Sequence, residues 1–176
     1  MQTIWNLDPS HSNVSFSIKH LMIAKVYGCF EKFTGTLVLD SEELTKSSVK
    51  ASIETNSVNT RNEERDTHVR SVDFFDTEKF PLITFKSTSV SDKKIVGDIT
   101  IHGITKPIEL ETEVTNEEIK DLSKNTKIRY SATTKIQLKD FGLTWNTALG
   151  GGGLLVGDEV SVMLDIQFVK QVIPIP

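Results

Sequence analysis

The chain has one cysteine, Cys29, among its 176 residues, so no disulfide bond can form within it. Cysteines of this kind are more often small buried residues than reactive thiols. No segment approaches about 18 consecutive apolar residues, the minimum for a membrane-spanning helix. The first residues also lack a basic stretch followed by an apolar one, the pattern of a secretory signal. We therefore expect a cytoplasmic protein with no transmembrane segment.

An excess of charge of either sign is also missing. The 20 basic and 24 acidic residues are well mixed and leave a net charge of −4. Proteins that bind nucleic acid or an anionic membrane usually carry a basic stripe or patch. We therefore expect neither a nucleic acid nor an anionic membrane surface as a partner.

Motifs for catalysis or metal binding are scarce. His11, His20, His68 and His102 include no pair at a short chelating spacing, so we expect no metal site. There is no Gly-x-Ser-x-Gly nucleophile motif, and the glycine run at 150–153 lacks the Lys-Ser/Thr that completes a phosphate loop. We therefore predict no catalytic residue and no cofactor, and an enzyme acting on a lipid-like substrate is the alternative.

What the sequence does contain is a regular alternation of apolar and polar residues. Val14, Phe16 and Ile18 fall on one face of a predicted strand, and the polar residues between them fall on the other. Similar runs, separated by Gly, Pro, Asp and Asn, occur at 26–30, 33–39, 49–53, 83–86, 95–101, 108–112, 128–138 and 160–168. The parity of the pattern changes near Glu31-Lys32, which predicts a bend or bulge there. These runs predict eight or nine strands in one domain, residues 1–176.

One segment, from about residue 59 to Ser71, is predicted to be helical. Thr60 and Glu63 have the spacing of a capping box, in which each side chain bonds to the other's backbone. Asp66 and Arg70 are four residues apart, as in an ion pair on a helix surface. Because this segment is mostly polar, with apolar residues on one side only, we expect it to lie across the sheet, where it could serve as a lid. The segments 116–125 and 150–153 are predicted to be surface loops.

The many short strands and the one helix are typical of a β-sandwich or an antiparallel β-barrel. The narrow, regular apolar rows favour the barrel, and a barrel of about eight strands is just wide enough to hold a small ligand. The predicted fold class is thus all-β: a lipocalin-like antiparallel β-barrel of about eight strands with one flanking α-helix.

Ordered motifs along almost the whole chain resemble the YceI-like family. They are Trp5-x-Leu7-Asp8-x-x-His11-Ser12-x-Val14-x-Phe16-x-x-x-His20, Gly28-x-Phe30-x-x-Phe33-x-Gly35, Arg65-Asp66-x-His68, Phe74-Phe75-Asp76, Phe80-Pro81-x-Ile83-x-Phe85-x-Ser87, Gly97-Asp98-Ile99-Thr100-x-x-Gly103-x-Thr105-Lys106-Pro107 and Asp140-Phe141-Gly142-Leu143. The resemblance implies a lipocalin-like barrel that binds an isoprenoid lipid, such as a polyprenyl chain or an isoprenoid quinone, for storage or transport. It also implies no established catalytic activity and a possible homodimer. Leu138 departs from the family pattern, which has an arginine just before Asp-Phe-Gly.

The candidate ligand-binding residues combine the apolar inward rows with polar residues of the helical segment. They are Phe16, Ile18, His20, Met22, Val26, Phe30, Phe33, Ile53, Arg65, His68, Phe74, Phe75, Ile83, Phe85, Phe141 and Trp145. By parity His20 follows Ile18 inward, whereas His11 lies on the outer face or in the turn before the strand. Besides the enzyme, two alternatives remain: a stress-response protein acting on a lipid-like substrate, and a structural barrel whose core is completely filled.

Overall fold

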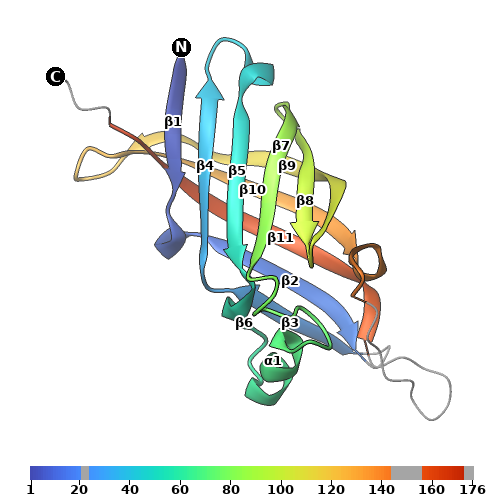
Figure 1. Cartoon of the computed structure of the whole chain (residues 1–176). Coiled ribbons are helices and arrows are strands. Elements are labelled where there is room, and N and C mark those ends of the chain that lie inside the picture. Colours follow the sequence, from blue (N-terminus) through green and yellow to red (C-terminus); the bar gives the residue numbers. More distant parts are fainter. Residues whose placement is uncertain (21–23, 144–155, 173–176) are drawn as a thin grey trace.

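A computed structural model describes residues 1–20, 24–143 and 156–172. Within these ranges one antiparallel sheet of 11 strands dominates the fold (Figure 1). The strands are β1 (Gln2–Leu7), β2 (Asn13–His20), β3 (Ala24–Phe30), β4 (Phe33–Asp40), β5 (Ser48–Glu54), β6 (Val58–Asn59), β7 (Leu82–Val90), β8 (Lys94–Ile101), β9 (Ile104–Lys120), β10 (Thr126–Gln137) and β11 (Val156–Lys170). The sheet follows the order β1-β4-β5-β7-β8-β9-β10-β11, and β11 pairs again with β1. The predicted closed barrel of eight strands with a flanking helix is thereby confirmed.

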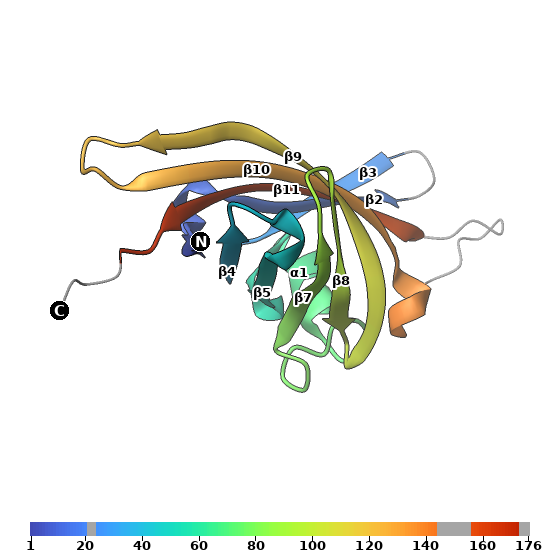
Figure 2. The ribbon, with the colours of Figure 1, turned by 90° about the horizontal axis from the view of Figure 1, so that it is seen from above.

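β11 pairs with two strands on one side. Its C-terminal end pairs with β1, with Leu7 opposite Phe168, and its middle pairs with β2, with Val14 opposite Leu164. A short 3-10 turn, η1 (Pro9–His11), joins β1 to β2. The two strands are therefore halves of one bent strand, and Figure 2 shows β9, β10, β11 and β2 arching together over one side of the barrel.

A second bend lies where the change of parity predicts one. β3 ends at Phe30 and β4 begins at Phe33, so the chain turns at Glu31-Lys32. Before this bend the chain lies outside the closed ring of eight strands, because β3 pairs with β2 on one side and with the two-residue β6 on the other. The helix α1 (Glu63–Arg70) follows β6 and lies at this end of the barrel (Figure 1).

The bend between β1 and β2 is held by Asp8. Its carboxylate accepts hydrogen bonds from the Ser10 backbone N–H (3.2 Å) and hydroxyl (2.7 Å) and from Gln167 Nε2 (3.0 Å), and it lies 2.8 Å from His11 Nδ1. Burial raises the pKa of Asp8, but the bonds from Ser10, His11 and Gln167 outweigh it and leave this pKa below the ordinary value of 3.8. His11 is exposed in the turn, as expected from its parity.

Several sequence expectations about local structure are corrected. Segment 116–125 is not wholly a loop, because β9 continues to Lys120 and only the turn before β10 separates the two strands. The sequence favours a turn from Gly103 to Pro107 between two strands, but the turn between β8 and β9 is the tight pair His102-Gly103, both with positive φ, and Pro107 lies inside β9. The glycine run at 150–153 lies outside the described residues. Within those residues no helix is both long and apolar enough to cross a membrane.

The helix begins later than the capping-box pattern predicts. Asn62, not Thr60, is the N-cap, and its side-chain oxygen accepts the Arg65 backbone N–H at 2.9 Å. Asp66 is not paired with Arg70 on the surface: Asp66 is buried and bonded to Thr60, and Arg70 Nε donates to the Asn56 carbonyl at 3.2 Å. The pattern misleads because the segment before the helix folds back over its first turn.

Candidate functional site

The inward faces of the barrel strands enclose a cavity of about 650 Å³. This volume is within the range of about 300–1,000 Å³ that is usual for ligand pockets. Aliphatic and aromatic side chains from every strand of the ring form the wall, although β1 contributes only Leu7 at its end. β2 and β3 add further apolar side chains. The alternation of apolar and polar residues along the strands explains why the wall is apolar while the outer surface is charged.

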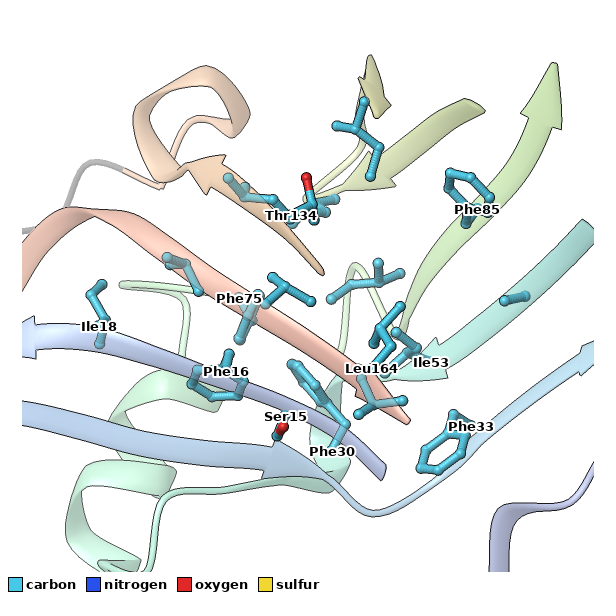
Figure 3. A pocket seen from close by; sticks show the side chains of 18 of the residues that line it. Ser15, Phe16, Ile18, Phe30, Phe33, Ile53, Phe75, Phe85, Thr134 and Leu164 are labelled. Atoms are coloured by element: carbon cyan, nitrogen blue, oxygen red, sulfur yellow. The ribbon is translucent and has the colours of Figure 1, made fainter. Parts of the chain in front are cut away.

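Most of the sequence-predicted site residues come together around this cavity. Those that line it are Phe16, Ile18, Val26, Phe30, Phe33, Ile53, Arg65, His68, Phe74, Phe75, Ile83 and Phe85. Figure 3 shows several of them pointing toward one space from different strands. The strand pattern and the helix-end motif therefore converge on a single site.

Four predicted residues are placed differently or not at all. Phe141 lies in the 3-10 turn η4 (Leu138–Phe141), is only 2% exposed and packs into the core rather than lining the cavity. Leu138 of the same turn and Leu143 just after it line the cavity instead. His20 belongs to β2 and pairs with Ala24, but its side chain lies outside the described part of the structure. Met22 and Trp145 lie outside the described residues.

Sequence reasoning missed part of the wall. The additional apolar lining residues include Leu7, Val49, Ile101, Ile108, Leu110, Leu138, Leu143, Leu164, Ile166 and Phe168. Most of them follow the same two-residue alternation as the predicted ones, so that signal could have identified them. β11 contributes lining residues both where it pairs with β2, such as Leu164, and where it pairs with β1, such as Phe168.

Aromatic rings form a connected row at the end of the cavity near α1. The ring centroids of Phe16 and Phe30 are 5.6 Å apart, those of Phe30 and Phe75 are 6.0 Å apart, and those of Phe74 and Phe75 are 5.0 Å apart. The last two pairs have the edge-to-face geometry that aromatic quadrupoles favour. This row joins the segment after α1 to the β2–β3 pair.

Polar residues of the lining are concentrated on α1 and the segment just before it. Asn62 and Glu64 are exposed and also line the cavity, which shows that the cavity reaches the surface beside α1. Arg65 donates from Nε to the Thr60 hydroxyl (2.8 Å) and from Nη2 to the Thr60 carbonyl (2.6 Å). His68 Nε2 lies 3.3 Å from Asp73 Oδ2. A ligand inside the barrel would thus meet apolar walls along its length and polar groups at this opening.

The single cysteine, Cys29, is half-buried on β3. Burial raises the pKa of its thiol, and the negative charge of Glu31 adds to the rise. A thiol with a raised pKa is mostly protonated and a poor nucleophile at neutral pH. Among the described residues, no group of three or more His, Cys, Asp or Glu side chains is arranged to hold a metal ion.

Fold and cavity together define a class of protein: a closed antiparallel β-barrel with an apolar ligand cavity. The chain belongs to the YceI-like family, whose domain model matches residues 5–168. It is 36% identical over 166 residues to UPF0312 protein SAS2572 of Staphylococcus aureus strain MSSA476, covering 94% of this chain and 97% of that protein.

Solved structures show the same fold. A YceI protein of Campylobacter jejuni is 28% identical with a TM-score of 0.72, covering 88% of this chain and 90% of that one. BcnA of Burkholderia cenocepacia is 20% identical with a TM-score of 0.76, covering 92% and 98%. A polyisoprenoid binding domain from Saccharophagus degradans is 16% identical with a TM-score of 0.69, covering 95% and 98%. The last two share the architecture at low sequence identity.

Proposed function

We propose that this protein binds the hydrocarbon chain of an isoprenoid lipid, a polyprenyl chain or the tail of an isoprenoid quinone, inside the barrel. One observation carries the proposal: the barrel encloses about 650 Å³ of space walled by apolar side chains. Each Å² of apolar surface removed from water contributes about 25 cal/mol, so a long hydrocarbon chain can be held without hydrogen bonds along its length. The cavity also argues against a structural barrel with a completely filled core.

The position of the polar residues supports an orientation for the ligand. Arg65, His68 and Glu64 lie where the cavity opens beside α1, so the head group would lie there and the chain would extend into the barrel. The name of the S. degradans neighbour, a polyisoprenoid binding domain, agrees with this class of ligand. Storage or transport of the lipid, rather than its conversion, is the role we assign.

The proposal is tested by identifying what the protein carries. Protein purified without detergent is extracted with organic solvent and the extract is analysed by mass spectrometry. The delipidated protein is then titrated with a polyprenol, an isoprenoid quinone and an unbranched alcohol of similar length. We expect an isoprenoid in the extract and saturable, one-to-one uptake of the prenyl compounds. An extract free of lipid together with no saturable uptake would reject the function.

Catalysis is addressed with the same material. The bound prenyl compound is incubated with the protein for several hours and re-extracted, and its mass is compared with that of the starting compound. We expect an unchanged mass. A product with an altered mass, absent from a sample with heat-denatured protein, would favour the enzyme alternative.

A further inference from the structure

Phe16 lies over a glycine of the neighbouring strand. Phe16 lines the cavity, and Gly28 is directly opposite it in the β2–β3 pair, on the same face of the sheet. A Cβ atom added to Gly28 would lie 2.8 Å from Phe16 Cε2 and closer still to Cζ. The Phe16 ring therefore occupies the space that any larger residue at position 28 would need.

A second aromatic ring lies over a glycine elsewhere in the wall. A Cβ atom on Gly97 of β8 would lie 2.5 Å from Phe85 Cζ and 2.7 Å from Phe85 Cε2, and 2.5 Å from the Lys86 carbonyl oxygen. Both phenylalanines line the cavity (Figure 3). In each case the missing side chain lets a large ring lie along the wall instead of extending across the barrel.

The neighbours of Phe16 and Gly28 decide which side chain gives way to an added methyl group. The Phe30 ring centroid is 5.6 Å from that of Phe16. The Thr60 methyl group would be 3.0 Å from a Cβ atom at position 28. Thr60 is buried, and its hydroxyl bonds to Asp66 Oδ1 (2.5 Å) and Arg65 Nε (2.8 Å), so it is held in place. Because Thr60 is held, the Phe16 ring is the group that an added methyl would displace, and this ring already borders the free space of the cavity.

We propose that Gly28 sets the length of isoprenoid chain that the barrel accepts, by giving the Phe16 ring its place along the wall. Gly97 has the corresponding role for Phe85. This inference rests on the proposed function. In Gly28→Ala the three atoms nearest the added methyl group belong to side chains, so the backbone can stay in place while the ring turns into the cavity and shortens it. Gly97→Ala is a less clean test, because its methyl group would also meet a backbone oxygen.

The experiment measures the affinity of delipidated protein for a series of polyprenols that differ only in the number of isoprene units. Wild type, Gly28→Ala, Phe16→Ala and Phe16→Ala/Gly28→Ala are compared. We expect Gly28→Ala to bind the longest accepted chains about tenfold more weakly, equivalent to about 1.4 kcal/mol, and short chains as the wild type does. Phe16→Ala should accept longer chains, and the double variant should match Phe16→Ala, because without the ring the methyl group displaces nothing.

Each outcome decides between the ring displacement and a general effect on the fold. Wild-type length preference in Gly28→Ala, or a double variant as impaired as Gly28→Ala, would overturn the inference. If Gly28→Ala does not fold, Phe16→Ala alone decides, because an unchanged length limit in that variant contradicts a role for the ring. Failure of the wild type to bind polyprenols of any length would reject the proposed function itself, a result distinct from an unchanged length preference.

Discussion

The buried carboxylate of Asp66 accepts two hydrogen bonds from Thr60, one from its backbone N–H (2.9 Å) and one from its hydroxyl (2.5 Å). Asp66 is 5% exposed and Thr60 4%. A buried carboxylate is tolerated when its oxygens are hydrogen-bonded. The pair fastens the first turn of α1 to the segment that precedes it, and so fixes the helix beside the opening of the cavity.

Replacing Asp66 by asparagine should destabilise the fold. The amide keeps the size of the side chain and an oxygen that can accept from Thr60, but it lacks the negative charge that strengthens these bonds, so we expect a loss of about 1–3 kcal/mol in the free energy of unfolding. Urea titration followed by circular dichroism measures the change. Glu63→Gln, on an exposed position of the same helix, is the control and should change stability by less than about 0.5 kcal/mol. Equal effects of the two substitutions would contradict the structural role of Asp66.

Asp8 should make stability depend on pH at the acid end. Because its pKa is lower in the folded than in the unfolded chain, its contribution is present above the unfolded value and is lost as pH falls through the folded pKa. We expect wild type to be more stable than Asp8→Asn at pH 7, and the difference to shrink below about pH 4. Urea titrations at several pH values test this, with Asp92→Asn at an exposed turn position as the control for loss of one charge. A difference that stays constant down to pH 3 would refute the prediction.

Replacement by phenylalanine should affect ligand binding at one of two adjacent residues of β11 but not at the other. Val162 lines the cavity, whereas Met163 is 48% exposed on the outer face. We expect Val162→Phe to weaken binding of a long polyprenol at least about tenfold, since the ring fills space needed by the ligand, and Met163→Phe to leave binding within about twofold. Both variants should remain folded, because one ring enters a cavity and the other faces water. Similar affinities for the two variants would show that the ligand binds elsewhere.

Trp5 should be essential for closure of the barrel. It is fully buried on β1, where it pairs with Leu37 on one side and Lys170 on the other, and its indole N–H donates to the Thr3 hydroxyl at 2.8 Å. We expect Trp5→Ala to reduce the free energy of unfolding by about 3–5 kcal/mol. Ile4→Ala, at the neighbouring outward position, should cost less than about 1.5 kcal/mol. Thermal and urea unfolding provide the measurement, and a loss below about 1 kcal/mol for Trp5→Ala would contradict this role.

The strands were predictable because the signal is local and has a period of two. Val14, Phe16 and Ile18 share a face in any extended strand, and the change of parity at Glu31-Lys32 marks the bend directly. The same pattern could not decide whether the barrel is filled or hollow. That depends on which residue lies opposite Phe16, and Gly28 becomes its partner only through the register of β2 and β3.

The helix end shows the second limit. Spacing along one helix favours a pair between Asp66 and Arg70, but the partner of Asp66 is Thr60, which lies before the helix and outside its periodicity. Phe141 was misplaced for a related reason, since the direction of its ring is set by the 3-10 turn and not by strand alternation. The roles of His20, Met22 and Trp145 in binding stay predictions.

The pairing of β1 with β11 has a consequence for how the barrel closes. Trp5 and its partner Lys170 are far apart in the sequence. Contacts between such distant parts of a chain form late in folding. The barrel wall is therefore incomplete until this late pairing forms, so we expect a ligand that needs the closed cavity to bind only after the two strands have met.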